Sequence, residues 1–231
     1  MKGKKGGKPG RSTEGAEGKA RTKPRQRTLS SQLWLRRQQR DPFVAAARRQ
    51  GYLSRAAFKL LDLDDRFHFF KPGRRVVDLG AAPGGWTQVA VERCGGGVLS
   101  VDLGRLPSIE GAKVLEVDIL RPDAPETVKA ALGGKAEIVL SDMAPASTGH
   151  RETDHMRSAA LVDAALRVAA ATLVPGGTFV AKLLQGGEEG EVMESLKRLF
   201  SSVKRAKPPA SRPDSAEVFL VATGFRGATA V

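Results

Sequence analysis

The chain has 231 residues, 41% of them hydrophobic, which suits one domain with a buried core and excludes two large ones. Its net charge of +13 is uneven, because residues 1–40 hold 13 Lys and Arg against Glu14 and Glu17, which leaves only +2 for the remainder. The single cysteine, Cys94, excludes an intrachain disulfide and a Cys-x-x-Cys metal site.

Residues 1–28 are predicted to be a disordered basic arm, followed by one domain over residues 29–231. The arm is rich in glycine and has no apolar face, so it cannot bury enough surface to offset its ordering entropy. Counterion release favours nucleic acid as its partner, although a merely solubilising tail is the alternative. Neither a secretory signal, a membrane-binding helix nor a transit peptide fits this composition. We therefore expect a cytoplasmic protein with no membrane partner.

The first predicted element of the domain is a helix over residues 54–67, with Ser54 as its N-cap and Lys59 on its surface. Ahead of it, Trp34 lies among arginines. Such a stretch can bind RNA phosphates and stack on a base, or Trp34 can simply anchor this segment to the domain.

Strands and helices then alternate along the chain. Apolar strands are predicted at 74–79, 98–102, 113–117, 137–142 and 178–183, with helices at 86–94, 124–132, 154–173 and 188–200. This alternation predicts a doubly wound, mostly parallel α/β sheet covered on both faces. Two closing strands, 202–207 and 217–222, have no helix between them, so we expect an antiparallel pair at the edge of a seven-stranded sheet.

The segment 76–86, VVDLGAAPGGW, is an apolar strand that runs into a glycine-rich turn. Gly80 and Gly84 allow the backbone to approach a ligand closely, at the sheet edge where open α/β folds bind ligands. The spacing is not G-x-G-x-x-G, and Asp78 would repel a pyrophosphate, which argues against a nucleotide-linked oxidoreductase. An acid in this place instead suits S-adenosyl-L-methionine, whose amino group and sulfonium are cationic.

Two further acids end predicted strands at the same edge. Asp102 is placed to accept hydrogen bonds from the ribose hydroxyls of a nucleoside, and Asp118, next to Ile119, could hold an adenine amino group. The alternative for both is an ordinary solvated acid at a strand end.

Five segments in this order resemble the FtsJ (RrmJ, RlmE) family: SRAAFKL at 54–60, VVDLGAAPGGW at 76–86, SDMAP at 141–145, GGTFVAKLLQG at 176–186 and EVFLVATG at 217–224. The resemblance implies a Rossmann-like methyltransferase fold. It also implies transfer of a methyl group from S-adenosyl-L-methionine to the 2′-hydroxyl of a uridine in large-subunit (23S-type) ribosomal RNA, by a monomer acting during late subunit assembly. Donor contacts through Trp86 and Asp142 follow from the same resemblance. The implied catalytic tetrad is Lys59, Asp142, Lys182 and Glu217, with Lys182 as proton acceptor.

Ribose methylation requires that a weak nucleophile be oriented and deprotonated. To accept the proton, Lys182 must be a neutral amine, which burial and Lys59 favour and which Asp142 and Glu217 oppose. The alternative is that Lys182 stays charged and orients the hydroxyl, while Asp142 accepts the proton. Lys59 and Glu217 would then organise the pocket and hold the ribose or its phosphate.

Other chemistries fit less well. SDMAP lacks the second proline and the aromatic residue of amino-group methyltransferases, and Cys94 lies too far from the turn to be a pyrimidine nucleophile. His150 and His155 have no third strong ligand nearby, so no metal is expected. Residues 211–215 are less basic than is typical of the family. A non-catalytic RNA-binding assembly factor, or methylation of another RNA, remains the alternative function.

Overall fold

The computed structural model describes residue 3, residues 41–186 and residues 189–227. The predicted arm, residues 1–28, and the stretch around Trp34 lie outside the described residues, apart from residue 3. From Asp41 onward the chain belongs to one compact unit, Gln39–Val231. None of the helices described is both long and apolar enough to cross a membrane.

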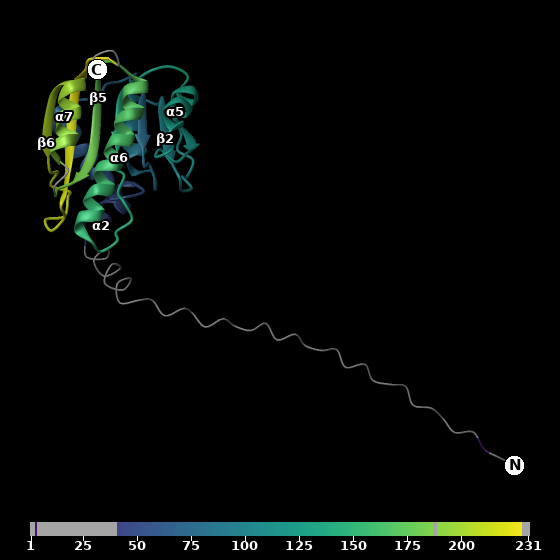
Figure 1. Cartoon of the computed structure of the whole chain (residues 1–231). Coiled ribbons are helices and arrows are strands. Elements are labelled where there is room, and N and C mark those ends of the chain that lie inside the picture. Colours follow the sequence, from purple (N-terminus) through teal and green to yellow (C-terminus); the bar gives the residue numbers. More distant parts are fainter. Residues whose placement is uncertain (1–2, 4–40, 187–188, 228–231) are drawn as a thin grey trace. The chain divides into compact units, whose positions relative to one another are not determined.

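A seven-stranded sheet forms the centre of this unit, as predicted (Figure 1). Its strand order is β3-β2-β1-β4-β5-β7-β6. Its strands β1 to β5 are parallel, and β7 runs antiparallel to both of its neighbours. The strands are β1 (Val76–Leu79), β2 (Val98–Asp102), β3 (Ala112–Glu116), β4 (Ala136–Ser141), β5 (Leu173–Leu184), β6 (Phe200–Ala206) and β7 (Glu217–Phe225). The expected antiparallel pair is confirmed, with β7 inserted between β5 and β6.

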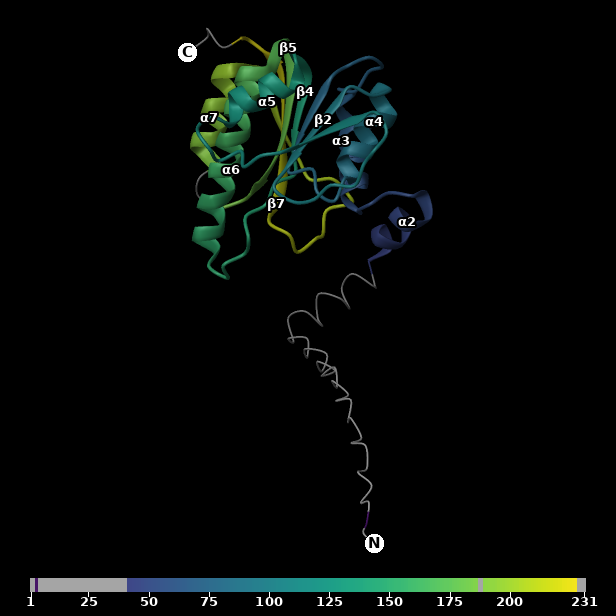
Figure 2. The ribbon, with the colours of Figure 1, turned by 90° about the vertical axis from the view of Figure 1, so that its right-hand side faces the viewer.

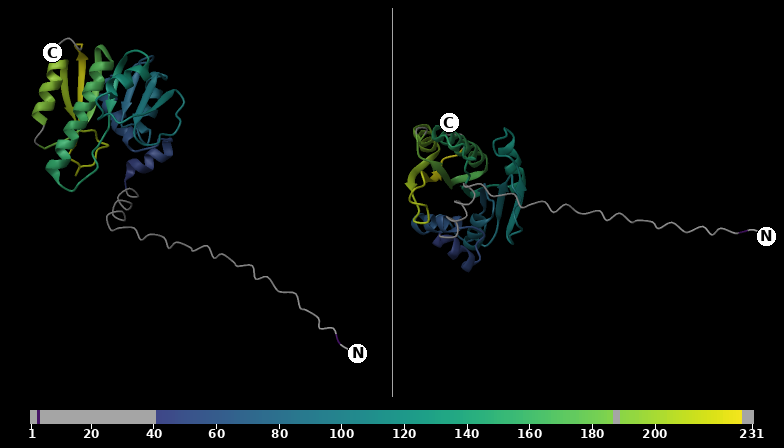
Figure 3. Two further views of the ribbon diagram at one scale, coloured as in Figure 1. Left: turned by 45° about the vertical axis from the view of Figure 1, so that its right-hand side comes forward. Right: turned by 90° about the horizontal axis from the view of Figure 1, so that it is seen from below.

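Helices cover both faces of the sheet (Figures 2 and 3). One layer contains α5 (Ala124–Leu132), α6 (Arg151–Thr172) and α7 (Glu189–Leu199), and the other contains α3 (Ala56–Phe67) and α4 (Gly85–Cys94). Side chains alternate between two apolar cores, because Val77 and Val139 face the first layer whereas Val76 and Ile138 face the second. This is the arrangement that places strand ends and helix starts at one ligand-binding edge.

A short helix that the sequence analysis missed, α2 (Pro42–Gln50), precedes α3. Asp41 is its N-cap and accepts a hydrogen bond from the Phe43 amide at 3.0 Å, Pro42 occupies the first helical position, and Gly51 closes it with a left-handed conformation. These three signals are visible in the sequence. The helix was missed because the sequence analysis considered the arginine-rich stretch ahead of residue 54 only as a possible RNA-binding segment.

The predicted N-cap of α3 is wrong. Arg55 occupies that position with helical dihedral angles, φ −62° and ψ −19°, and makes no side-chain capping bond. The Ser54 Oγ points instead toward α4, where it occupies the space in which a Cβ on Gly85 would lie. Its hydroxyl therefore packs against the first residue of α4 rather than the open end of α3.

Candidate active site

A cavity of about 410 Å³ opens at the carboxyl ends of β1, β2 and β4. Four of the predicted cofactor residues line it: Gly80, Asp102, Asp118 and Asp142. Its apolar wall includes Leu103, Ile119 and Leu120. The volume suits a small organic ligand, and its mixture of apolar wall and few carboxylates is typical of such sites.

The glycine-rich turn is shaped by close contacts that exclude side chains. At Gly80, φ is +72° and a Cβ would lie 2.3 Å from Met143 Cγ. Gly84 has φ +113°, and a Cβ there would lie 2.8 Å from Leu53 Cδ1. The backbone conformation therefore favours glycine at both positions, and at Gly80 the close approach of Met143 excludes a side chain as well. Gly84 is the N-cap of α4 and lies outside the residues that line the cavity.

The two strand-end acids are oriented by backbone amides. Asp102 accepts hydrogen bonds from Ala82 N at 2.9 Å and Gly104 N at 2.7 Å, one on each carboxylate oxygen. Asp118 accepts one from Leu120 N at 2.9 Å. Because a carboxylate oxygen has two lone pairs, each group keeps acceptor capacity toward the cavity.

Asp78 is fully buried beneath this turn and does not line the cavity. Its Oδ2 accepts a hydrogen bond from the Thr87 hydroxyl at 2.7 Å, and Thr87 also contacts Ser100 Oγ at 2.8 Å. Its Oδ1 is buried and has no hydrogen-bond partner among the described residues. The pKa of Asp78 is raised to about 7, chiefly by burial, with smaller increases from the charges of Asp142 and Asp102 and an opposing decrease from the Thr87 hydrogen bond.

Trp86 also lies outside the cavity. Its side chain is buried, its Nε1 donates to Ala56 O at 2.8 Å, and its ring packs against Phe219 with centroids 5.7 Å apart. The indole therefore ties α4 to α3 and β7, the two elements that carry Lys59 and Glu217.

Asp142 and Lys182 form an ion pair at the strand ends. Asp142 directly follows β4, and Lys182 lies near the end of the neighbouring β5. The Lys182 Nζ lies 2.9 Å from Asp142 Oδ1, and it donates a hydrogen bond to the Asp142 backbone oxygen at 2.6 Å. Lys182 is only 9% exposed, so this charge is held in a largely desolvated place.

Lys59 and Glu217 form a second buried ion pair. Lys59 Nζ lies 2.7 Å from Glu217 Oε1 and donates to Oε2 at 2.9 Å, and it also stands 5.6 Å above the Phe219 ring. Burial alone would raise the pKa of Glu217, but Lys59 and, to a smaller extent, Ser211 and Lys182 lower it below its usual value. Glu217 is therefore a carboxylate at neutral pH.

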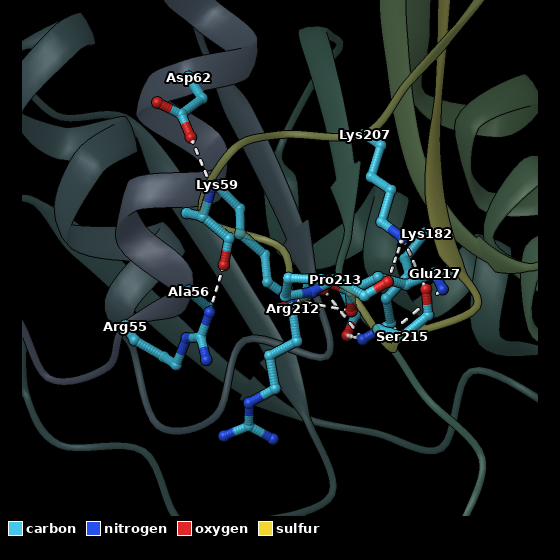
Figure 4. Close-up of polar contacts among 12 residues, drawn as sticks. Arg55, Ala56, Lys59, Asp62, Lys182, Lys207, Arg212, Pro213, Ser215 and Glu217 are labelled. Atoms are coloured by element: carbon cyan, nitrogen blue, oxygen red, sulfur yellow. Dashed lines mark hydrogen bonds and ion pairs between the residues drawn. The ribbon is translucent and has the colours of Figure 1, made fainter. Parts of the chain in front are cut away.

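The two ion pairs are neighbours. In the β5–β7 register Lys182 pairs with Phe219 and Leu184 pairs with Glu217, so Lys182 and Glu217 share one face of the sheet. Figure 4 shows Lys182 next to Glu217. The structure thus brings together all four residues of the predicted tetrad, and Asp142 belongs both to this cluster and to the cavity.

Sequence reasoning missed the residues that surround the second ion pair. Arg55 bonds to Asp41 and to the backbone oxygen of Ala210, and Asp62 accepts a hydrogen bond from Ala210 N at 3.2 Å. A signal was present, since Arg55, Lys59 and Asp62 follow the i, i+4, i+7 spacing of one helix face.

Cys94 is buried at the end of α4, and within the described part of the chain no cluster of His, Cys, Asp and Glu could hold a metal.

A family model described as FtsJ-like methyltransferase matches residues 52–225. A ribosomal RNA large subunit methyltransferase E of Paramagnetospirillum magneticum is 56% identical over 212 residues, covering 89% of this chain and 87% of the relative. A protein of the same name from Xanthobacter autotrophicus is 50% identical, covering 95% of this chain and 89% of the relative. A solved protein of Plasmodium falciparum, provisionally described as a ribosomal RNA methyltransferase, is 27% identical with a TM-score of 0.69, covering 76% of this chain and 100% of its own. The chain therefore belongs to the FtsJ-like methyltransferase family.

Proposed function

We propose that this protein transfers a methyl group from S-adenosyl-L-methionine to the 2′-hydroxyl of a uridine ribose in large-subunit (23S-type) ribosomal RNA. The relatives named for the large-subunit RNA support the substrate, and membership of a methyltransferase family supports the reaction. The observation that carries the proposal is the double placement of Asp142, which lines the cavity and holds Lys182. A donor in the cavity and a hydroxyl at Lys182 would therefore meet at one carboxylate.

The cavity fits the methyl donor. Asp142 lines the cavity, so its carboxylate, whose Oδ1 lies 2.9 Å from Lys182 Nζ, offers a negative charge beside a cationic group of the ligand. Asp102 is oriented to accept from two ribose hydroxyls, and Asp118 with Ile119 can bind an adenine by a hydrogen bond and apolar contact. When bound, S-adenosyl-L-methionine supplies an electrophilic methyl group on a sulfonium, which is already a good leaving group.

Lys182 acts on the other reactant. As the ribose oxygen forms its bond to the methyl carbon, the carbon–sulfur bond breaks, its electron pair returns to sulfur, and the hydroxyl proton passes to the Lys182 amine. The hydrogen bond that Lys182 Nζ donates to the Asp142 backbone oxygen at 2.6 Å fixes the position of the amine for this step. In the alternative path Lys182 stays charged and orients the hydroxyl while Asp142 accepts the proton.

The Lys59–Glu217 pair holds the substrate side of the site. It lies next to Lys182 and keeps two opposite charges desolvated in fixed positions, so it can orient the ribose hydroxyl or the adjoining phosphate without rearranging during the reaction.

Residues 1–28 supply a polybasic segment that would add affinity for RNA through counterion release. We place the protein in the cytoplasm as a monomer, acting on the large subunit or its precursor during late assembly.

The decisive experiment is mass-spectrometric mapping of ribose methylation in ribosomal RNA from a strain that lacks this protein. One uridine should lose its 2′-O-methyl group, and the wild-type gene should restore it. The Lys182→Ala variant should not restore it, although it should keep binding S-adenosyl-L-methionine in calorimetry. Lys129→Ala, a change at an exposed lysine of α5, is the matched control and should restore methylation.

Two outcomes would contradict the proposal. Unchanged methylation of large-subunit RNA in the deletion strain would leave another RNA as the substrate. Restoration of methylation by Lys182→Ala at the wild-type rate would remove Lys182 from the chemistry.

A further inference from the structure

The loop between β6 and β7, residues 207–216, leads directly into Glu217. Its central residue Ala210 is fully buried, and both polar groups of that residue's backbone are held from α3. The amide of Ala210 donates to Asp62 Oδ2 at 3.2 Å, and its carbonyl accepts from Arg55 Nη2. Figure 4 labels the two side chains, Arg55 and Asp62. A single loop residue is thus fixed at two points by side chains of the helix that also carries Lys59.

These helix contacts come from one face of α3 and its N-cap. Arg55, Lys59 and Asp62 are spaced i, i+4 and i+7, so they form a line along the helix. The two outer residues bind Ala210, and the middle one binds Glu217. The position of Ala210 along α3 therefore sets where the following strand begins relative to Lys59.

Asp41 supplies a further link between the start of α2 and this loop. Its Oδ2 pairs with Arg55 Nη1 and lies 3.5 Å from Arg212 Nε, while its Oδ1 caps α2. The Asp41 side chain is only 8% exposed, so these charges interact with little solvent screening. Arg55 uses the two arms of its guanidinium at once, one on Asp41 and one on Ala210, a geometry that a lysine amine cannot reproduce.

The loop also braces its own end. Lys207 Nζ donates to the carbonyl oxygens of Ser215 at 2.8 Å and Pro213 at 3.3 Å, and Glu217 N donates to Ser215 Oγ at 3.2 Å. This second set of bonds makes the stretch from Pro213 to Glu217 compact. Once Ala210 is fixed, little freedom remains for the carboxylate of Glu217.

We propose that Arg55 and Asp62 are positioning residues, which act by clamping Ala210 so that Glu217 meets Lys59, and that Asp41 holds Arg55 in its clamping orientation. The clamp does not touch the donor cavity, whose lining contains none of these residues. Its effect on turnover rests on the proposed function, whereas its effect on the loop does not. Loss of the clamp should therefore change the loop and the rate of methyl transfer, and leave donor binding alone.

The test compares matched variants of the full chain. Arg55→Met and Asp62→Leu should each raise hydrogen exchange of the amides in residues 211–217 about tenfold, the factor expected for loss of a hydrogen bond to a charged group. Arg55→Lys should also raise the exchange of these amides, because a lysine reaches only one of the two partners. Asp62→Asn should exchange like the wild type, because its amide oxygen still accepts from Ala210. Arg66→Met, at an exposed position of the same helix, is the control.

Kinetics with RNA distinguish positioning from general stability. In Arg55→Met and Asp62→Leu, kcat should fall about tenfold or more, while the Kd of S-adenosyl-L-methionine stays within about twofold of wild type. Nuclear magnetic resonance of Glu217 should show its pKa rising, because burial then acts with less compensation from Lys59.

Loop exchange equal to that of Arg66→Met would overturn the clamp, as would an equal loss of function in Asp62→Asn and Asp62→Leu. If the wild-type protein methylates no RNA, the proposed function fails, and loop exchange together with the Glu217 titration still decides the clamp.

Discussion

Asp78 makes the stability of this protein depend on pH in a direction that can be measured. The group is fully buried and its pKa rises from 3.8 to about 7 in the folded protein, chiefly through burial. Between these two values the folded state binds more protons than the unfolded state. The contribution of protonated Asp78 to the free energy of unfolding is therefore fully present below pH 3.8 and is lost as the pH rises through 7. At about 1.4 kcal/mol per pKa unit, the loss amounts to about 4 kcal/mol.

The variant Asp78→Asn tests this value, because an amide of nearly the same shape has no charge to desolvate. Urea unfolding of donor-free protein between pH 4.5 and 8, followed by tryptophan fluorescence, gives the free energy of unfolding. From pH 4.5 to pH 8 the free energy of unfolding of the variant should rise relative to that of the wild type by about 3 kcal/mol, the part of the loss that falls in this range. Any constant cost of the amide cancels in this comparison, as does the opposite dependence from Glu217, whose lowered pKa removes stability at acid pH.

Asp163→Asn, at a carboxylate that is 60% exposed, is the control and should follow the wild type. Parallel pH profiles for Asp78→Asn and wild type would refute the reasoning. They would mean that Asp78 is ionised at little cost, because solvent or a hydrogen-bond donor reaches its Oδ1.

Three further predictions follow from the site. Gly80→Ala should abolish donor binding in calorimetry while the protein still folds by circular dichroism, since its Cβ would lie 2.3 Å from Met143 Cγ; unchanged affinity would show that the turn can shift. Lys59→Met should raise the pKa of Glu217 above its usual value, measured by nuclear magnetic resonance, because burial then dominates; a pKa that stays low would assign the effect to Ser211 and Lys182. Deletion of residues 1–28 should weaken RNA binding and flatten its dependence on salt, and equal salt slopes for both proteins would exclude the arm from the complex.

Much of the architecture could be predicted because strands and helices of this chain have strong local patterns. Val98–Asp102 and Ala124–Leu132 were predicted at their observed boundaries, since an apolar run and an apolar helical period each end at clear breakers. Strand β5 begins five residues earlier than predicted, at Leu173 rather than Thr178. Proline and two glycines in that stretch read as a turn, and only the pairing of Leu173 with Ala136 keeps it in the sheet.

The site was predictable where family motifs mark it and unpredictable where tertiary contacts define it. The motif positions identify Lys59, Asp142, Lys182 and Glu217, which the structure brings together. The side-chain direction of Trp86 could not be read from its motif, because the bond to Ala56 O depends on how α3 packs on α4. Helical spacing places Arg55 on one face with Lys59 and Asp62, but its role depends on a contact with a residue 155 positions away, and spacing does not predict that contact.

The reversed strand β7 explains why the four polar side chains converge although two of them lie at opposite kinds of strand end. Lys182 lies near the carboxyl end of β5, where a parallel fold presents its ligand-binding groups. Glu217 is the first residue of β7, and because β7 runs antiparallel, its amino end lies beside the carboxyl end of β5. A parallel strand at this place would carry its first residue to the far edge of the sheet. The inversion of the last strand therefore lets a loop held by α3 deliver a carboxylate to the reactive edge, which a helix crossover could not do in the same number of residues.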